Sequence, residues 1–368
     1  MLTFGPVPSR RLGRSLGINN IPPKICTYSC VYCQLGRTLQ MQAERRAFYP
    51  PQDIVKAVQD KVECERMKQI VVLSGKGGTG KTTVTGALAH LASQELSLVL
   101  ADADVDAANL ELLLAPIKRE EHDFISGQLA VIDPTKCMAC GVCASVCRFD
   151  AIVAPSRHAG EEAYRVDAQA CEGCAACFYQ CPEQAIRMEK QRAGRWFRSD
   201  TRLGPLLHAR LFAGQENSGK LVTLIKQRAR QLAETTGASL LLVDGPPGIG
   251  CPVIAATAGA DLALLVTEPT LAGVHGLERI LGTTAHFKVP ALVVINKADL
   301  NPAQSERIAA FCEERDVDVI GRIPYDHIVT EAMVQGRPVT EYADGRVAEV
   351  LGAVWAQLKN RLPPAGVP

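Results

Sequence analysis

The chain has 368 residues, of which 47% are hydrophobic and 21% charged, and 40 Lys and Arg against 39 Asp and Glu give a formal net charge of +1. That length predicts two or three domains, and the charge balance argues against a nucleic-acid partner. Residues 1–18 are rich in arginine, and no apolar run approaches the ~18 residues of a membrane-spanning helix. We therefore expect a soluble, cytoplasmic protein without a signal peptide or membrane anchor.

Short apolar runs alternate with helical patterns from residue 67 onward. The runs lie at residues 70–74, 98–101, 240–243, 262–267 and 291–295, and the main helical patterns at 82–93, 220–235 and 302–315. Buried strands that alternate with helices are typical of a parallel sheet covered on both faces, so we predict an α/β fold with a mostly parallel sheet. A last helical pattern at residues 350–362 has few basic residues, which favours a packed helix over a membrane anchor.

Fourteen cysteines divide the chain further, because eight of them form two quartets that interrupt this rhythm. Clustered thiols in a long chain without a signal peptide indicate metal sites, whereas disulfide frameworks belong mainly to short secreted chains. We predict four segments: an N-terminal segment at 1–66, a first part of the α/β domain at 67–128, an inserted cysteine-rich domain at 129–189 and a second part of the α/β domain at 190–368.

A phosphate-binding loop stands between the first predicted strand and the first predicted helix, where residues 75–82 fit G-x-x-x-x-G-K-[ST]. Its glycines let backbone N–H groups face phosphates, and the helix N-terminus favours the anion. Lys81 is expected to reach the β- and γ-phosphates, and the Thr82 hydroxyl to bind Mg²⁺. We expect the nucleotide to contact Gly75, Lys76, Gly77, Gly78, Thr79, Gly80, Lys81, Thr82 and Thr83.

The early lysine of this loop, Lys76, makes it resemble the deviant Walker A motif of the MinD, Mrp and ParA class of P-loop ATPases. The resemblance extends over most of residues 67–368. It implies that two copies of the chain enclose ATP at their nucleotide faces. It also implies a catalytic role for Lys76, which would reach the phosphates bound by the partner, beside Lys81.

The same resemblance gives roles to acidic and amide residues that follow later predicted strands. Asp104 would orient the attacking water, Asp102 would lie near Mg²⁺, and Asp244 would hold Mg²⁺ through water. Asn296 would contact the purine base. Asp299 would suit guanine, but the class implies adenine and hence ATP.

The two quartets each read C-x2-C-x2-C-x3-C, a pattern that resembles bacterial-type ferredoxins of α+β fold. In two-cluster ferredoxins the fourth cysteine of each run binds the other cluster. We therefore predict one [4Fe–4S] cluster on Cys137, Cys140, Cys143 and Cys181, and a second on Cys171, Cys174, Cys177 and Cys147. Zinc is the competing metal. Arg148 stands where a proline is usual, and its positive charge would raise the potential of the second cluster.

Near the N-terminus, Cys26, Cys30 and Cys33 form C-x3-C-x2-C with Tyr32 before the last cysteine. This triplet and residues 4–13 resemble radical S-adenosylmethionine enzymes, which implies a third [4Fe–4S] cluster with S-adenosylmethionine. Only residues 34–69 separate the triplet from the first predicted strand, too few for the barrel of such enzymes. We expect a truncated opening segment without independent radical catalysis, and cluster binding there is left open.

Three cysteines lie outside these groups. Cys251 follows Asp244 by seven residues, in the segment where the nitrogenase iron protein of the same class carries a cluster ligand. A second such cysteine has no clear counterpart, which favours a small buried thiol at Cys251. Cys64 and Cys312 lie in helical patterns and are expected to be structural.

These observations lead to two main hypotheses for function. The first is MgATP hydrolysis coupled to electron transfer through two clusters to an unidentified redox partner. The second is an ATP-dependent carrier that delivers a cluster or metal cofactor to an accepting protein, as in Mrp-type proteins. Closed four-cysteine sites favour the first, and Cys251 at a dimer axis would favour the second. A spatial regulator of the MinD type is a weaker third.

Overall fold

The computed structural model describes residues 67–156, 162–215 and 217–362, together with short backbone segments within residues 1–56. The chain divides into two compact units, residues 1–66 with 363–368 and residues 67–362. In the first unit β1 (Thr3–Ser9) pairs antiparallel with β2 (Gly13–Ile18), and β3 (Ile25–Cys26) pairs parallel with β4 (Gln40–Met41). Cys30, Cys33, Cys64 and the side chain of Cys26 lie outside the described residues, and with them the predicted third cluster site.

The second unit is built on a nine-stranded sheet. Its strands, from one edge to the other, are β15 (Val319–Ile323), β14 (Ala291–Asn296), β13 (Leu262–Thr267), β5 (Lys68–Ser74), β12 (Leu240–Pro247), β6 (Leu98–Asp102), β11 (Gly204–Leu211), β10 (Ile186–Thr201) and β7 (Ile117–Ile132). The strands from β15 to β11 are parallel to one another, whereas β10 and β7 are antiparallel to their neighbours. The predicted mostly parallel α/β sheet is thereby confirmed.

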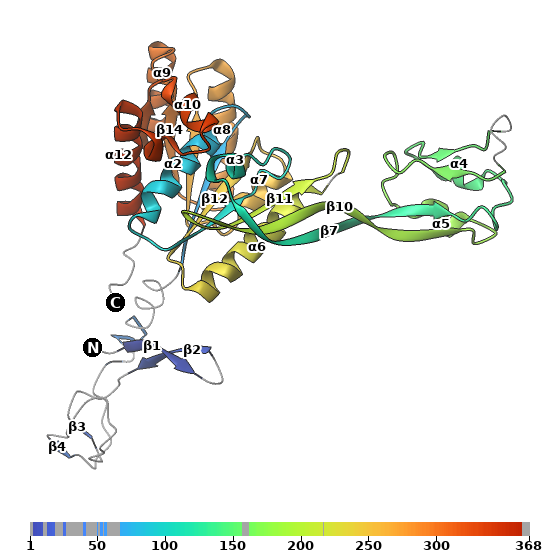
Figure 1. Ribbon diagram of the computed structural model, residues 1–368, viewed down its shortest axis with the longest axis horizontal. Coiled ribbons are helices and arrows are strands. Elements are labelled where there is room, and N and C mark those ends of the chain that lie inside the picture. The colour runs from blue at the N-terminus through green and yellow to red at the C-terminus, as the bar shows by residue number, and fades with distance from the viewer. Residues whose placement is uncertain are drawn as a thin grey trace. The chain divides into compact units, whose positions relative to one another are not determined.

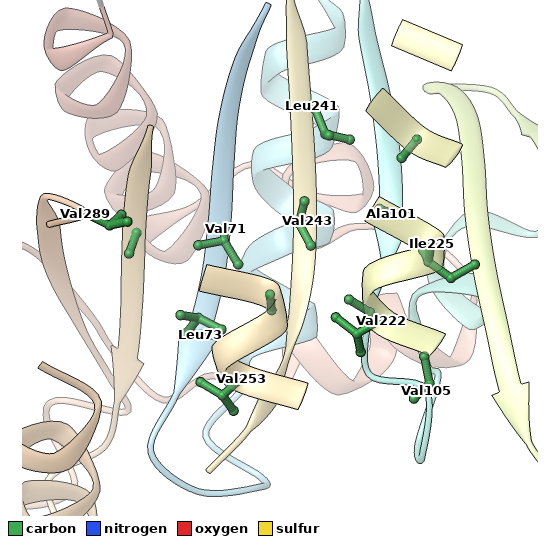
Figure 2. Close-up of a cluster of buried hydrophobic side chains, with 14 of the residues drawn as sticks. Val71, Leu73, Ala101, Val105, Val222, Ile225, Leu241, Val243, Val253 and Val289 are labelled. Carbon is green, nitrogen blue, oxygen red and sulfur yellow. The ribbon is translucent and has the colours of Figure 1, made fainter. Parts of the chain in front are cut away.

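Helices cover both faces of the parallel part of the sheet (Figure 1). One face carries α6 (Ser218–Thr236), α7 (Cys251–Thr257), α8 (Leu271–His286) and α9 (Pro302–Glu313), and the other α2 (Lys81–Ser93), α3 (Leu110–Leu114), α10 (Ile328–Val334), α11 (Val339–Tyr342) and α12 (Arg346–Arg361). Because side chains alternate along a strand, Val71 and Leu73 of β5 pack on the α6 side with Val222 and Val253, as Figure 2 shows. Both faces are buried, which explains the continuous apolar runs.

The strands β7 and β10 continue beyond the sheet as a two-stranded arm (Figure 1). Their ladder begins where Ile117 of β7 pairs with Asp200 of β10 and ends where Ile132 pairs with Ile186. In contrast, β10 pairs with β11 only from Gly194 onward. The far end of the arm carries the small elements α4 (Val142–Val146), β8 (Ile152–Val153), β9 (Arg165–Val166) and α5 (Ala176–Gln180). The predicted boundaries at 128/129 and 189/190 therefore fall inside two continuous strands.

Charged side chains stabilise the base of the arm and explain why its strands do not resemble buried ones. Arginines of β10 face acidic residues of β7, with Arg198 Nη1 2.7 Å from Glu120 and Arg195 Nη1 2.6 Å from Glu121. Such exposed cross-strand pairs contribute a few tenths of a kcal/mol, up to ~1 kcal/mol each.

No helix in the described part of the chain is long and apolar enough to cross a membrane.

Candidate nucleotide and cysteine sites

The loop at residues 75–80 joins β5 to α2, at the carboxyl edge of the sheet where parallel α/β folds bind ligands. Gly80 adopts the left-handed backbone conformation, with φ of 87°, and a Cβ there would lie 2.2 Å from Nδ2 of Asn296. A larger residue would be strained at this φ and would displace the Asn296 amide. The loop therefore packs directly against the end of β14.

Beneath the loop, Lys81 is buried between two carboxylates. Its Nζ lies 3.1 Å from Oδ1 of Asp244 and 3.4 Å from Oδ2 of Asp104. Burial alone would lower the pKa of Lys81, but the nearby carboxylates, Asp244 above all, outweigh that effect and raise it. Lys81 is therefore a permanent positive charge at the position where the motif expects the phosphates.

Two of the residues predicted to bind Mg²⁺ are in direct contact. The Thr82 hydroxyl donates to Oδ2 of Asp244 at 2.7 Å, and the Thr85 hydroxyl donates to Oδ1 of the same carboxylate at 3.0 Å. A hydroxyl and a carboxylate are oxygen ligands of the kind that Mg²⁺ prefers. The structure thus brings Thr82 and Asp244 to one point beside Lys81.

The third of these residues, Asp102, is fully buried, and both of its oxygens accept backbone N–H groups. The donors are Asp104 N at 3.1 Å and Leu110 N at 3.0 Å. Burial raises the pKa of Asp102 to about 8, and the Asp244 carboxylate adds to the shift. In this structure Asp102 holds the loop after β6 closed, so that Asp104 faces Lys81.

A cavity of about 600 Å³ opens over the loop and Asp104. Its other wall is formed by residues that the sequence analysis missed, Pro324, Tyr325, Asp326, Val329 and Met333. They follow β15, whose short apolar run at residues 319–323 is the signal that would have located them, because ligands bind beyond the carboxyl ends of such strands.

The two predicted base-recognition residues fasten loops to one another. Asn296 lines the cavity, donates from Nδ2 to the Thr79 carbonyl at 2.8 Å and accepts the Lys297 N–H at 3.0 Å. Asp299 does not line the cavity, and its Oδ1 accepts the Tyr325 N–H at 2.7 Å. Asn296 therefore stands beside the space for a nucleotide, whereas Asp299 shapes the loop that borders it.

Lys76 is engaged within its own chain. Its ammonium forms an ion pair with Glu268 and lies 3.3 Å from the Thr270 hydroxyl, while Nζ of Lys297 lies 3.5 Å from the second oxygen of Glu268. The Lys76 side chain keeps 31% of its surface exposed. It lies outside the buried group around Lys81, so its predicted role toward a partner's phosphates stays a prediction.

At the far end of the arm, two small cavities are lined by cysteines. One cavity has Cys137, Cys140, Cys143 and Cys181 in its wall, and the other has Cys147, Cys171, Cys174 and Cys177. Each thus gathers three cysteines of one run and the fourth of the other. The remaining wall is largely apolar, with Ile132 and Ile186 in the first and Ala130 and Met188 in the second.

The loops that carry the cysteines have matching backbone shapes. In the first, Ala139 and Gly141 have positive φ angles of 53° and 79°, and in the second Gly173 and Ala175 have φ of 65° and 61°. Left-handed residues in tight turns form concavities of backbone N–H groups that attract anions. Positive φ is costly for alanine, and such strain concentrates at functional sites.

Among the described residues, no group of three or more His, Cys, Asp or Glu is arranged to hold a single metal ion.

Two further cysteines are described. Cys312 is buried in α9, and burial raises the pKa of its thiol to about 11. The expectation of a buried thiol at Cys251 is wrong, because Cys251 is exposed as the first residue of α7. Its side chain is outside the helix face that buries Val253 and Ala256 against the sheet.

The parallel sheet, the glycine-rich loop before α2, and Lys81 with Thr82 and Asp244 define a P-loop nucleotide-binding protein. A family model described as the CobQ/CobB/MinD/ParA nucleotide binding domain matches residues 70–339. The chain belongs to this family.

Individual proteins resemble different portions of the chain. An uncharacterized protein of Methanocaldococcus jannaschii is 36% identical over 233 residues, 63% of this chain and 79% of that protein. A UPF0026 protein of the same organism is 62% identical over 61 residues, 17% of this chain and only 19% of that protein. The septum site-determining protein MinD complexed with Mg-ADP, from Pyrococcus horikoshii, is a structural neighbour with a TM-score of 0.48 at 16% identity, covering 80% of this chain and 96% of that one.

Proposed function

We propose that the protein hydrolyses MgATP and couples hydrolysis to electron transfer through two [4Fe–4S] clusters. The observation that carries the proposal is the sorting of eight cysteines into two four-cysteine cavities on an arm that continues the P-loop sheet. Membership of a nucleotide-binding family supports the first half of the proposal, and the chemistry of the cavities supports the second.

On the nucleotide side, residues that meet below the loop have distinct roles. Thr82 and Asp244 would hold Mg²⁺, which offsets phosphate charge when it is bound. Lys81 supplies a fixed positive charge for the β- and γ-phosphates, because its neighbouring carboxylates keep it protonated. Asp104 lines the cavity and faces Lys81, the position from which it would orient a water toward the terminal phosphate.

On the cysteine side, the walls fit iron–sulfur clusters in three respects. Each cavity offers four thiols, a largely apolar lining and backbone N–H groups turned by left-handed residues. Bound clusters would supply one-electron chemistry. Cys143 and Cys177, one from each cavity, are buried in a shared apolar cluster with Ala130 and Ile186, so the two cavities are neighbours.

A second copy of the chain would complete the nucleotide site. The side chains of Leu112, Tyr325 and Met333 are exposed in the wall of the nucleotide cavity. A homodimer through this face would bury them and bring Lys76 toward the partner's phosphates. In that case Lys76 would have to leave Glu268.

The test combines metal analysis with an anaerobic redox titration read by electron paramagnetic resonance. We expect the two cavities to contribute eight irons per chain, and the cluster potentials to shift when MgATP is added. A shift of 59 mV corresponds to a tenfold change for one electron. Cys171→Ala should lose one cluster, and Lys81→Ala should abolish both ATP turnover and the shift. Cys312→Ser removes a buried thiol outside both cavities and should keep both clusters.

Zinc in place of iron, or unchanged iron in Cys171→Ala, would refute the cluster assignment. Normal ATP turnover in Lys81→Ala would refute the nucleotide assignment. Potentials that do not respond to MgATP would refute the coupling and leave the two assignments standing.

The exposure of Cys251 favours a second candidate, an ATP-dependent carrier of a cluster or metal cofactor. The thiol lies just beyond β12, which carries Asp244, and a second copy could supply a matching thiol. Cluster transfer to an apo-ferredoxin that requires ATP and is lost in Cys251→Ser would support this candidate. Transfer that is equal in Cys251→Ser and the wild type would remove it.

A further inference from the structure

The stretch that follows β6 leads from the nucleotide cavity to the strands of the arm. We name residues 103–114 the connecting segment; it begins beside Asp104 and ends with α3. Ala107, Asn109 and Leu112 of this segment line the nucleotide cavity. Asp102 accepts the N–H groups of Asp104, near the start of the segment, and of Leu110, the first residue of α3. Asp102 therefore ties the start of the segment to the first residue of α3.

The connecting segment is attached to the β10–β11 hairpin at both ends of β11. At the carboxyl end, the Leu211 N–H donates to the Val105 carbonyl at 3.2 Å. At the hairpin turn, the Arg202 guanidinium donates to the Leu113 and Leu114 carbonyls at 3.1 and 3.0 Å. Since these carbonyls end the short helix α3, Arg202 acts as its C-terminal cap.

A third attachment lies between these two and includes buried polar side chains. Glu111, whose side chain is 12% exposed, forms an ion pair with Arg210 of β11. The Nδ1 atom of His208 lies 3.2 Å from the Glu111 carboxylate but makes no hydrogen bond to it. The other ring nitrogen of His208, Nε2, lies 2.9 Å from the Ser199 hydroxyl of β10. Burial lowers the pKa of His208 to about 4, so the ring is neutral at pH 7 and the ion pair of Glu111 is with Arg210.

The hairpin passes directly into the arm. The last β10–β11 pair joins Gly194 to Leu211, and the Phe212 N–H still donates to the Ala193 carbonyl at 2.9 Å. Beyond this point β10 runs to Met188 and Ile186, which lie in the walls of the two cysteine cavities. One continuous strand thus connects the attachments of the connecting segment with both cavities.

From this geometry we infer that the connecting segment and the β10–β11 hairpin move as one body, and that this body transmits the state of the nucleotide site to the arm. Glu111 is the positioning residue of the linkage, because its carboxylate joins α3 to β11 without touching the nucleotide cavity. The inference rests on the proposed function only in requiring a nucleotide at the P-loop. It does not require that the clusters transfer electrons.

The test is amide hydrogen exchange of the full-length protein with and without MgATP, followed in peptides from the arm at residues 124–132 and 186–193. In the wild type we expect nucleotide to change exchange in these peptides about fivefold or more, the lower range of coupling between sites. Glu111→Gln removes the charge and keeps the shape. It should bind MgATP within about twofold of the wild type and lose most of the arm response.

Matched variants separate coupling from general damage. Arg210→Gln removes the same ion pair from its exposed side and should reproduce the loss of the arm response, even if Glu111→Gln does not fold. Arg210→Lys keeps the positive charge and should show the arm response of the wild type. Glu120→Gln removes an ion pair at the base of the arm that does not touch the connecting segment. It should respond like the wild type.

Each outcome decides the matter. A full arm response in Glu111→Gln and Arg210→Gln would overturn the inference, and so would a wild-type arm that does not respond although bound nucleotide is measured independently. A full response in the two variants would leave the proposed function standing, whereas a wild-type arm that does not respond would also count against the coupling and leave only the nucleotide and cluster assignments. An absence of nucleotide binding in the wild type would overturn both.

Discussion

The burial of His208 gives the protein an acid sensitivity that can be calculated. Burial, together with the charge of Lys118, lowers the pKa of His208 from 6.5 to about 4. Between these values the unfolded chain binds a proton that the folded protein excludes. This contribution to stability is therefore complete above pH 6.5 and is lost as the pH falls toward 4. Each pH unit inside the window is worth about 1.4 kcal/mol, so a change from pH 7 to pH 5 removes about 2 kcal/mol.

His208→Asn tests this reasoning through the pH dependence of stability. The variant should be less stable than the wild type at pH 7, because the Ser199 hydroxyl loses its partner. In urea unfolding at pH 7 and pH 5, its loss of unfolding free energy should be smaller than that of the wild type by about 2 kcal/mol. His286→Asn, at an exposed histidine, should lose as much as the wild type. An equal loss in His208→Asn and the wild type would refute the excluded proton.

Three further changes have direct expectations. Lys226→Met removes an ammonium that donates to three backbone carbonyls at the end of α7. It should lower the unfolding free energy by about 2 kcal/mol in urea titrations, and an unchanged midpoint would contradict this. Gly75→Ala places a Cβ 2.1 Å from the backbone of Gly276, and should lower the melting temperature in calorimetry or weaken nucleotide binding; a variant normal in both would show that the loop yields. Asp299→Ala should leave the preference between ATP and GTP unchanged in competition binding, because its carboxylate accepts the Tyr325 N–H; a shift toward either nucleotide would place Asp299 at the base.

The parallel part of the fold could be predicted because its strands are buried on both faces. The five apolar runs of the sequence correspond to β5, β6, β12, β13 and β14. Each strand begins within two residues of the start of its predicted run and ends within four residues of the end of that run. The strands β11, β10 and β7 were missed because they are not uniformly apolar. His208 and Arg210 interrupt β11, and β10 and β7 carry the charges of an exposed ladder. Their strand character comes from pairing, which a single sequence does not display.

The sites were predictable to the extent that one local motif defines them. The loop at residues 75–82 has its residues in sequence, so its position followed at once. Contacts between distant residues did not, because they depend on packing. Lys76 meets Glu268 across 192 positions, and Asn296 donates to the Thr79 carbonyl across 217 positions. The identity of these residues was evident, but their partners were not.

The length of the arm decides how a nucleotide can influence the cysteine cavities. From Gly194, the last residue of β10 paired with β11, to Met188 in the wall of the nearer cavity are six residues, about 20 Å along a strand. At physiological ionic strength, charges separated by more than about 8 Å across solvent are largely screened. A direct effect of the phosphates on the cavities is therefore small. Any dependence of the cavities on nucleotide within one chain therefore has to pass along the two strands of the arm, β7, which follows α3 in the chain, and β10, whose hairpin is attached to the connecting segment through the Glu111–Arg210 ion pair and through Arg202.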